Sequence, residues 1–388
     1  MKDFTFYVPT DIRFGRSALD ALAAGVRKYG TKVLLVYGGG SIKKTGLYDK
    51  VIGILDEAGI PHAEVSGVEP NPKLENLVEG LRVAREEKID VVLAIGGGSV
   101  IDCGKAIAAC FDYEGDPWDI VTKKAALGRV LPILTIQTMP GTGSEMSTSS
   151  VISRMDINKK VGFSDAAMRP RMSFINPEYA FTVPKESTAA GIADAFSHVV
   201  ESYFSNVREA YLQARMGEAI CNTLVTYGAK CVQEPDNYEA RANILWACSW
   251  AINGILTKGN PVTWSMHSME NELSGYFDIA HGVGLGILVP AWLKWMLREE
   301  NAYRYVEFGR GVFGILAEGR DEMETAREVI GRTEEFFTSM GLPLKLGQVG
   351  IEREKLSVMA DNIGDTKLAK AFVPLDAKGI LEILELAF

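Results

Sequence analysis

The sequence is poor in cysteine. It has five cysteines in 388 residues (Cys103, Cys110, Cys221, Cys231 and Cys248), an odd number, scattered along the chain and without a CxxC pair. This usage argues against a disulfide framework and indicates buried thiols in a reducing compartment. We therefore expect a cytoplasmic protein.

Long apolar runs and an excess of positive charge are also missing. No window approaches the roughly 18 apolar residues that a membrane span needs, and the first residues lack the apolar region of a signal peptide. The net charge is −9, without a basic stripe, so we expect neither nucleic-acid nor membrane binding. The apolar fraction of 47% and charged fraction of 23% are those of an ordinary globular protein.

Residues 1–185 alternate short apolar runs with helical patterns. The pattern predicts strands at 33–37, 63–65, 91–95 and 131–136, and helices at 17–29, 48–58, 74–87 and 100–110. Apolar strands that alternate with helices predict a parallel sheet covered on both faces. Residues 5–14 are β-prone but contain Pro9, which predicts an edge strand or an arm.

Residues 186–388 have a different sequence pattern, because helical periodicity dominates and strand-like apolar runs are almost absent. Helices are predicted at 186–204, 208–230, 236–257, 262–273, 282–298, 300–317, 322–340 and 377–387. We therefore predict two domains, 1–185 and 186–388, with Pro184 at the hinge.

The chain has four histidines, and three of them form a set with one carboxylate. Asp194 and His198 are i,i+4 on a predicted helix, so they share a face about one turn apart, and His267 and His281 follow later. Three imidazoles and one carboxylate suit Fe²⁺, Zn²⁺, Mn²⁺ or Ni²⁺. Gly282, next to His281, permits a close approach of backbone or ligand. The alternative is a group of structural histidines, since Asp-x-x-x-His is a frequent chance pattern.

Two glycine-rich or hydroxyl-rich loops follow predicted strands. Gly96-Gly97-Gly98-Ser99 lies between a strand and a helix, where backbone N–H groups can hold a pyrophosphate. It is neither GxGxxG nor a Walker loop, and a plain β–α turn is the alternative. The loop 138–145 has the small hydroxylic residues that a cofactor crevice needs, although a connecting loop could share this composition.

A third loop, Gly38-Gly39-Gly40-Ser41, ends the first predicted strand, where nucleotide-binding sheets often recognise the adenosine ribose. An acidic residue, typical of NAD sites, is missing from this loop, and Lys43 and Lys44 follow it. We therefore expect NADP(H) to be favoured over NAD(H). The alternative is that both lysines are ordinary surface residues.

Together these segments resemble the iron-containing, or group III, alcohol dehydrogenase family over essentially the whole chain. Within the family the chain is most similar to the butanol dehydrogenase and broad-range aldehyde reductase branch. The resemblance rests on residues 96–102, 138–145, Asp194-x-x-x-His198, His267 with His281-Gly282, and the branch markers 37–46, 69–72 and 238–243.

The resemblance implies a dehydroquinate-synthase-like fold, with an N-terminal Rossmann-like nucleotide-binding domain and a C-terminal all-helical metal-binding domain. It implies that Fe²⁺ or Zn²⁺ is held by Asp194, His198, His267 and His281. It also implies coenzyme contacts from Asn71, Gly97, Gly98, Ser99, Asp102, Thr138, Thr142, Ser147 and Lys160, in addition to Gly38, Gly39 and Ser41.

One position departs from the family pattern. Many members carry a histidine four residues after the third ligand, often proposed to relay a proton, and Asn271 stands there in this chain. Because Asn cannot titrate, water or a ribose hydroxyl would have to carry the proton. Trp264 and Phe163 are candidate pocket walls, although either could be plain core.

The expected activity is hydride transfer between nicotinamide C4 and a short- or medium-chain primary alcohol or aldehyde, such as butanol or butanal, with the metal polarising the substrate oxygen. The alternatives are a polyol dehydrogenase acting on glycerol or a propanediol, a lyase of the same fold, and a metal- or nucleotide-binding protein without turnover. An edge strand near the N-terminus favours a homodimer.

Overall fold

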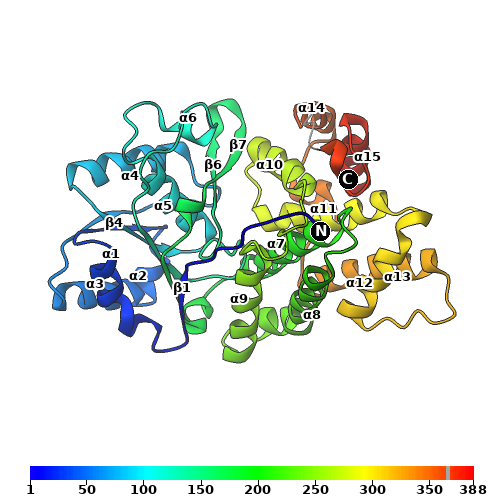
Figure 1. Cartoon of the computed structure of the whole chain (residues 1–388), viewed down its shortest axis with the longest axis horizontal. Coiled ribbons are helices and arrows are strands. Elements are labelled where there is room, and N and C mark those ends of the chain that lie inside the picture. Colours follow the sequence, from blue (N-terminus) through cyan, green and yellow to red (C-terminus); the bar gives the residue numbers. More distant parts are fainter. Residues whose placement is uncertain (364–367) are drawn as a thin grey trace. The chain divides into compact units, whose positions relative to one another are not determined.

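The computed structural model describes residues 1–363 and 368–388 and divides the chain into two compact units. The first comprises Tyr7–Val183, and the second comprises Pro184–Phe388 together with Met1–Phe6 (Figure 1). The sequence predicted a single boundary after residue 185, whereas here the first six residues group with the helical unit and that unit resumes at Pro184. Lys2 N donates a hydrogen bond to the carbonyl of Gly259 at 3.1 Å, which accounts for this placement.

The α/β unit contains a six-stranded, wholly parallel sheet in the order β1-β8-β5-β4-β2-β3. Its strands are β1 Asp11–Phe14, β2 Val33–Tyr37, β3 His62–Val65, β4 Val91–Gly96, β5 Ile133–Gln137 and β8 Met172–Ile175. A separate antiparallel pair is formed by β6 Ser149–Arg154 and β7 Lys159–Ser164.

Helices cover both faces of the sheet, as the continuous apolar strands predicted. Leu34 and Val36 of β2 pack in one core cluster with α4 and α5, whereas Val33 and Leu35 pack in the other with α1 and α3. The helices of this unit are α1 Leu22–Tyr29, α2 Ser41–Lys44, α3 Leu47–Glu57, α4 Leu74–Glu86, α5 Gly98–Cys110 and α6 Pro117–Val121.

The glycine loops lie at the carboxyl ends of the strands, on one side of the sheet, because parallel strands all end on the same side. The chain runs from β2 outward to β3 and later from β4 in the opposite direction to β5, so the order reverses between β2 and β4. Ligands of such sheets bind outside the carboxyl ends of the strands at this reversal. The loops after β2 and β4 therefore lie on the side of the sheet where a ligand is expected to bind.

The predicted strands are present within one to two residues, and β1 is an edge strand as expected. The strands β6, β7 and β8 have no counterpart in the prediction. β6 and β7 mix apolar residues with serine, lysine and arginine, and β8 has four residues, so neither gives a strong apolar run.

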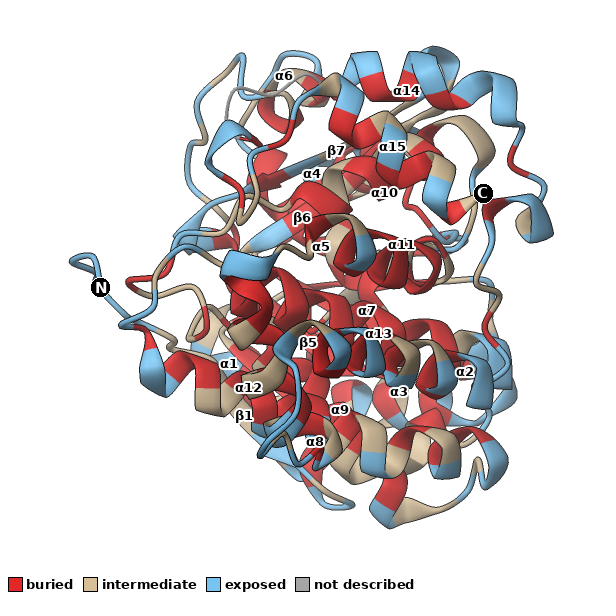
Figure 2. Cartoon of the chain, turned by 90° about the vertical axis from the view of Figure 1, so that its right-hand side faces the viewer, coloured by how far each residue is buried: buried red, intermediate tan, exposed pale blue. Residues whose placement is uncertain are grey.

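Among the described residues, the second unit contains helices and loops and no strand. Its helices are α7 Lys185–Tyr203, α8 Tyr211–Gln233, α9 Tyr238–Ile252, α10 Ser265–Phe277, α11 His281–Met296, α12 Ala302–Phe313, α13 Glu322–Ser339, α14 Leu356–Asn362 and α15 Ala377–Ala387. Every residue of α7 from Thr188 to Tyr203 is buried (Figure 2). A helix buried on all sides lies at the centre of its unit, and α7, α8, α9 and α11 pack together.

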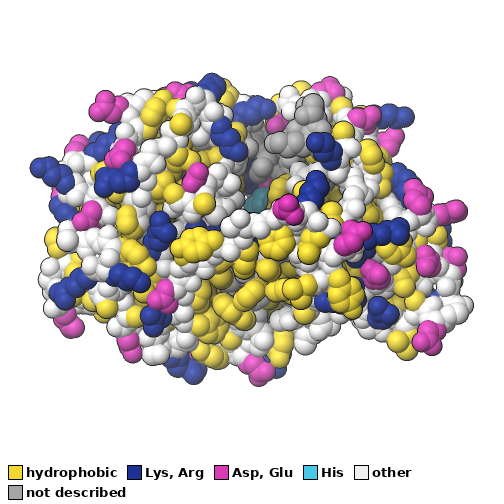
Figure 3. All heavy atoms as spheres, viewed as in Figure 1, with side chains coloured by type: hydrophobic (Ala, Val, Ile, Leu, Met, Phe, Trp, Pro, Cys, Tyr) yellow, Lys and Arg dark blue, Asp and Glu magenta, His cyan; other side chains and the backbone are white. Residues whose placement is uncertain are grey.

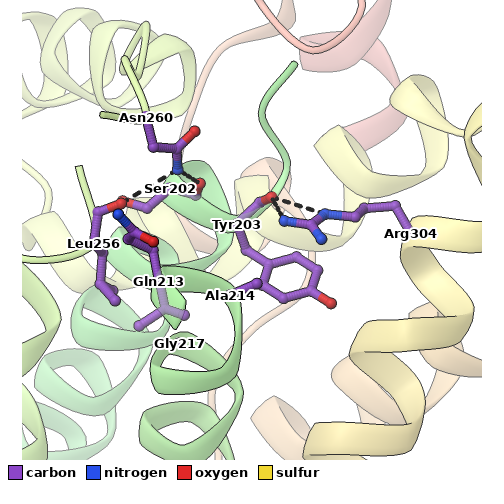
Figure 4. A pocket seen from close by; sticks show the side chains of 9 residues that line it. Ser202, Tyr203, Gln213, Ala214, Gly217, Leu256, Asn260 and Arg304 are labelled. Atoms are coloured by element: carbon purple, nitrogen blue, oxygen red, sulfur yellow. Dashed lines mark hydrogen bonds between the residues drawn. The ribbon is translucent and has the colours of Figure 1, made fainter. Parts of the chain in front are cut away.

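The carboxyl end of α7 is held by side chains from two other segments (Figure 4). Asn260 Nδ2 donates to the Ser202 carbonyl at 2.7 Å, and Arg304 Nη2 donates to the Tyr203 carbonyl at 2.9 Å. The last carbonyls of a helix have no partner within the helix, and a cation there also complements the helix dipole. These contacts fix the axial position of α7.

Within the described residues, no helix is long and apolar enough to cross a membrane. On the face drawn in Figure 3, basic and acidic side chains are interspersed and no continuous basic area is visible.

Candidate metal centre and coenzyme loops

Three helices of the helical unit bring four chemically active side chains together. Asp194 and His198 lie one turn apart on α7, His267 lies in the first turn of α10, and His281 begins α11. The distances from Asp194 Oδ1 to the Nε2 atoms are 3.4 Å for His198, 4.0 Å for His267 and 3.8 Å for His281.

Two of these atoms are buried without a hydrogen-bond partner among the described residues, namely Asp194 Oδ1 and His267 Nε2. A buried polar atom costs free energy unless it is paired. Asp194, His267 and His281 each offer a ligand atom, and these atoms lie within 4.8 Å of one another. The donor set is the one that Fe²⁺ and Zn²⁺ accept, so the residues fit a divalent metal ion.

His198 Nε2 is the imidazole nitrogen nearest to Asp194 Oδ1, although His198 is not part of the group whose ligand atoms all lie within 4.8 Å of one another. Its ring stacks on that of His267 with centroids 4.8 Å apart and planes 13° apart. Burial is the main cause that lowers the pKa of His198 to about 3. The imidazole is therefore neutral at physiological pH, and a neutral imidazole has the lone pair that a fourth ligand requires.

Two buried glutamates orient the histidines, and sequence reasoning missed both. Glu201 Oε2 lies 2.5 Å from His267 Nδ1, and Glu270 accepts a hydrogen bond from His281 Nδ1. A carboxylate on Nδ1 fixes the tautomer that leaves the Nε2 lone pair available and raises the basicity of the imidazole. Burial opposes protonation of His267, but the Glu201 carboxylate outweighs it and raises the pKa of His267. The i+7 spacing of Glu201 from Asp194 was the available signal.

Glycine brings α11 close to α7. A Cβ on Gly282 would collide with the backbone of Ala190, whose Cα would lie 3.0 Å away. The absence of a side chain at Gly282 therefore places His281 near Asp194. The sequence predicted a close approach here, and the approaching group is the backbone of α7.

Asn271 lies one turn beyond His267 on α10, and its Oδ1 is buried without a hydrogen-bond partner in the described parts of the chain.

The two residues predicted as candidate pocket walls lie in different parts of the fold. The Trp264 ring lies edge-on to His267, 5.2 Å between centroids, whereas Phe163 is buried in the core of the α/β unit. Trp264 is therefore the one that shields the imidazoles.

The loop after β4 leads directly into α5, which begins at Gly98. A Cβ on Gly97 would lie 2.5 Å from Met139 Sδ, and one on Gly98 would collide with Thr142. The loops after β4 and β5 thus interlock where no side chain fits, at the N-terminus of α5, and the N–H groups of a helix N-terminus can bind a phosphate. Ser99 lies in the first turn of α5, and Thr138 follows β5.

A buried lysine ties α5 to the loop after β5. Lys105 is fully buried, and its Nζ donates to Ser144 Oγ at 2.7 Å, Ser147 Oγ at 3.0 Å and the Ser149 carbonyl at 2.9 Å. Asp102 accepts hydrogen bonds from Ser144 Oγ at 2.5 Å and from Val151 N at 2.9 Å. Asp102 and Ser147, both predicted coenzyme contacts, therefore also belong to the network that holds this loop.

At the end of β2, Gly40 adopts φ +98° and α2 begins at Ser41. Lys43 and Lys44 are exposed. The loop itself carries no acidic residue, as expected, but β3 brings Glu64 close to the end of β2: the Glu64 carboxylate accepts hydrogen bonds from Tyr37 Oη at 2.6 Å and Tyr48 Oη at 2.5 Å. The sequence does not reveal this contact, since Glu64 comes from another strand.

The remaining predicted coenzyme residues lie in the same unit. A Cβ on Gly38 would lie 3.1 Å from the Val68 carbonyl, whereas one on Gly39 would meet nothing within 4 Å. Asn71 is buried with φ 51° after β3, and Lys160 is largely buried on β7.

The comparisons agree with this architecture. The pattern of the iron-containing alcohol dehydrogenase family matches residues 9–177, and that of the family's C-terminal region matches residues 188–388. NADH-dependent butanol dehydrogenase B of Clostridium acetobutylicum is 47% identical over 390 residues, 99% of each chain. NADPH-dependent aldehyde reductase YqhD of Escherichia coli is 36% identical over 92% of each chain.

A solved structure shares the whole fold. The crystal structure of NADH-dependent butanol dehydrogenase A from Thermotoga maritima superimposes with a TM-score of 0.92 at 37% identity, covering 100% of this chain and 99% of the other. Sequence and structure therefore lead to one conclusion: the chain belongs to the iron-containing alcohol dehydrogenase family.

Proposed function

We propose that this chain is a metal-dependent, NAD(P)(H)-linked oxidoreductase that interconverts short- or medium-chain primary alcohols and aldehydes of the butanol and butanal type. The observation that carries the proposal is the convergence of the Asp194 carboxylate and three imidazoles at one buried point of the helical unit. The names of the relatives, butanol dehydrogenase and aldehyde reductase, support this substrate class.

The chain's residues have distinct tasks in this proposal. Asp194, His198, His267 and His281 hold the ion, which when bound would polarise the substrate oxygen. Glu201 and Glu270 keep the imidazoles in the ligating tautomer.

The coenzyme loops position the reaction partner. Backbone N–H groups at Gly97, Gly98 and Ser99 hold the pyrophosphate, Lys105 fixes the loop that carries Thr142 and Ser147, and the bound nicotinamide would exchange the hydride. Asn271 provides no titratable group, so water or a ribose hydroxyl carries the proton.

NADP(H) is proposed as the favoured coenzyme, because Lys43 and Lys44 are exposed beside the Gly38–Ser41 loop and can meet a 2′-phosphate. Relatives named for either coenzyme exist, so the affinities for NADPH and NADH have to be compared directly. A tighter complex with NADH would refute this part of the proposal.

A homodimer in the cytoplasm is proposed for the assembled enzyme. The edge strand β1 can pair across a twofold axis, and five buried, free thiols suit a reducing compartment. Light scattering that gives the monomer mass would refute the dimer, and cell fractionation tests the compartment.

The central test is the His267→Ala variant. The matched control is His62→Ala, since His62 lies on β3, away from the four candidate metal ligands. Bound metal is measured together with NADPH or NADH consumption during reduction of butanal. We expect His267→Ala to lose both metal and turnover and His62→Ala to keep both. A fully active His267→Ala enzyme would refute the assignment, and a preference for glycerol or propanediol would favour a polyol dehydrogenase instead.

A further inference from the structure

Four side chains form a compact cluster beside the loop after β2. Tyr37 and Tyr48 each donate a hydrogen bond to a different oxygen of Glu64. Their rings lie 5.7 Å apart, and Lys43 Nζ lies over both, 5.1 Å from the Tyr37 centroid and 4.5 Å from that of Tyr48. We call these residues the Glu64 cluster.

The Glu64 cluster is electrically balanced at neutral pH. Burial opposes ionisation of Glu64, but the hydrogen bonds from Tyr37 and Tyr48 and the charge of Lys43 outweigh it, so the pKa of Glu64 lies below its usual value. The hydrogen bond to Glu64 is the main cause that raises the pKa of Tyr48 to about 12, so the phenol stays neutral. The charge of Lys43 thus faces the Glu64 carboxylate and also that of Asp49.

The cluster lies where the coenzyme phosphates are expected. Tyr37 pairs with Ile95 in the sheet register and Gly96 ends β4, so the segments that begin at Gly38 and Gly97 are adjacent. The segment at Gly97 leads to the α5 N-terminus, which suits a pyrophosphate. Nucleotide-binding sheets discriminate the 2′ position of the adenosine ribose at the neighbouring strand end, and here that strand end carries Tyr37 and is followed by Lys43.

We propose that Glu64 is a specificity-determining residue that weakens, without reversing, the preference for NADPH given by Lys43 and Lys44, because it fixes the two tyrosine rings over which Lys43 lies and offsets part of its charge. This inference rests on the proposed function through its use of a nicotinamide coenzyme. A 2′-phosphate would have to draw Lys43 away from the rings and would be repelled by the Glu64 carboxylate. NADH has a hydroxyl at this position, so its binding requires neither the displacement of Lys43 nor a negative charge close to Glu64.

The test compares the full-length protein with Glu64→Gln, which removes the charge and keeps the size of the side chain. Dissociation constants for NADPH and NADH are measured by fluorescence titration without substrate, so the readout does not require turnover. We expect the ratio Kd(NADPH)/Kd(NADH) to fall about tenfold in Glu64→Gln, the effect of losing one nearby, partly screened charge. Glu57→Gln, the same change at the exposed carboxyl end of α3, is the matched control and should leave the ratio unchanged.

The double variant Glu64→Gln/Lys43→Ala shows whether Glu64 acts through Lys43. If Glu64 acts through Lys43, Glu64→Gln should change Kd(NADPH)/Kd(NADH) much less in the Lys43→Ala background than in the wild-type background. An unchanged ratio in Glu64→Gln, with normal thermal stability, would overturn the inference while leaving the proposed function intact. Failure of the wild-type protein to bind either coenzyme would overturn both.

Discussion

The Glu201→Gln variant tests whether a buried carboxylate on α7 sets the metal affinity of the site. Glu201 is 4% exposed, and its two oxygens accept from His267 Nδ1 at 2.5 Å and from Met266 N at 2.7 Å. Glutamine can still accept from Met266 N through its carbonyl, but it then presents an NH₂ group to His267. The imidazole would have to move its proton to Nε2, which is the atom that faces Asp194.

The expected cost follows from that change. Loss of the carboxylate that orients a ligating histidine lowers metal affinity about 10- to 100-fold, or roughly 1.4–2.8 kcal/mol. The assay is a competition titration of the apoprotein with Zn²⁺ or, under anaerobic conditions, Fe²⁺, against a chromophoric chelator. Glu186→Gln, the same change at the exposed start of α7, is the control. An unchanged metal affinity in folded Glu201→Gln would refute the role given to Glu201.

Three further predictions concern other parts of the chain. Asn271→His places a titratable group one turn from His267, so we expect the pH profile of kcat to gain an ionisation near pH 6–7; a profile identical to wild type would exclude a relay at this position. Burial lowers the pKa of Lys105 from 10.5 to about 8, so between these values the unfolded chain binds more protons and stability should rise with pH by up to about 3 kcal/mol. Urea unfolding of Lys105→Met should lack that rise, and a rise equal to wild type would contradict the assignment. Burial raises the pKa of Cys103 and of Cys110 to about 12, so a thiol reagent at neutral pH should label these cysteines only after unfolding, and rapid labelling of the native protein would show that they are accessible.

The sequence predicted those strands whose apolar pattern matches their burial in the folded sheet. β2 and β4 are continuous apolar runs because both of their sides are buried, so their positions were readable from five or six consecutive residues. The strand β8 was not readable. Its four residues become a strand because β1 and β5 pair with it on either side, and pairing between distant segments leaves no local signal.

The site shows the same division. The resemblance and the scarcity of histidine pointed to Asp194 and the three imidazoles, which the structure brings together. Glu270, Lys105 and Glu64 were missed, because each acts on a partner brought near by the packing of another element. Charged residues are common on helices and strands, and only the fold reveals that Lys105 and Glu270 are wholly buried.

The candidate ligands come from helices separated by a long stretch of chain. Asp194 and His198 precede α8 and α9, whereas His267 and His281 follow them. An ion bound by all four would close a loop around two helices that contribute no ligand. Such a cross-link removes conformational entropy from the unfolded chain, as a disulfide does. The ion would therefore stabilise α8 and α9 against local opening without touching either of them.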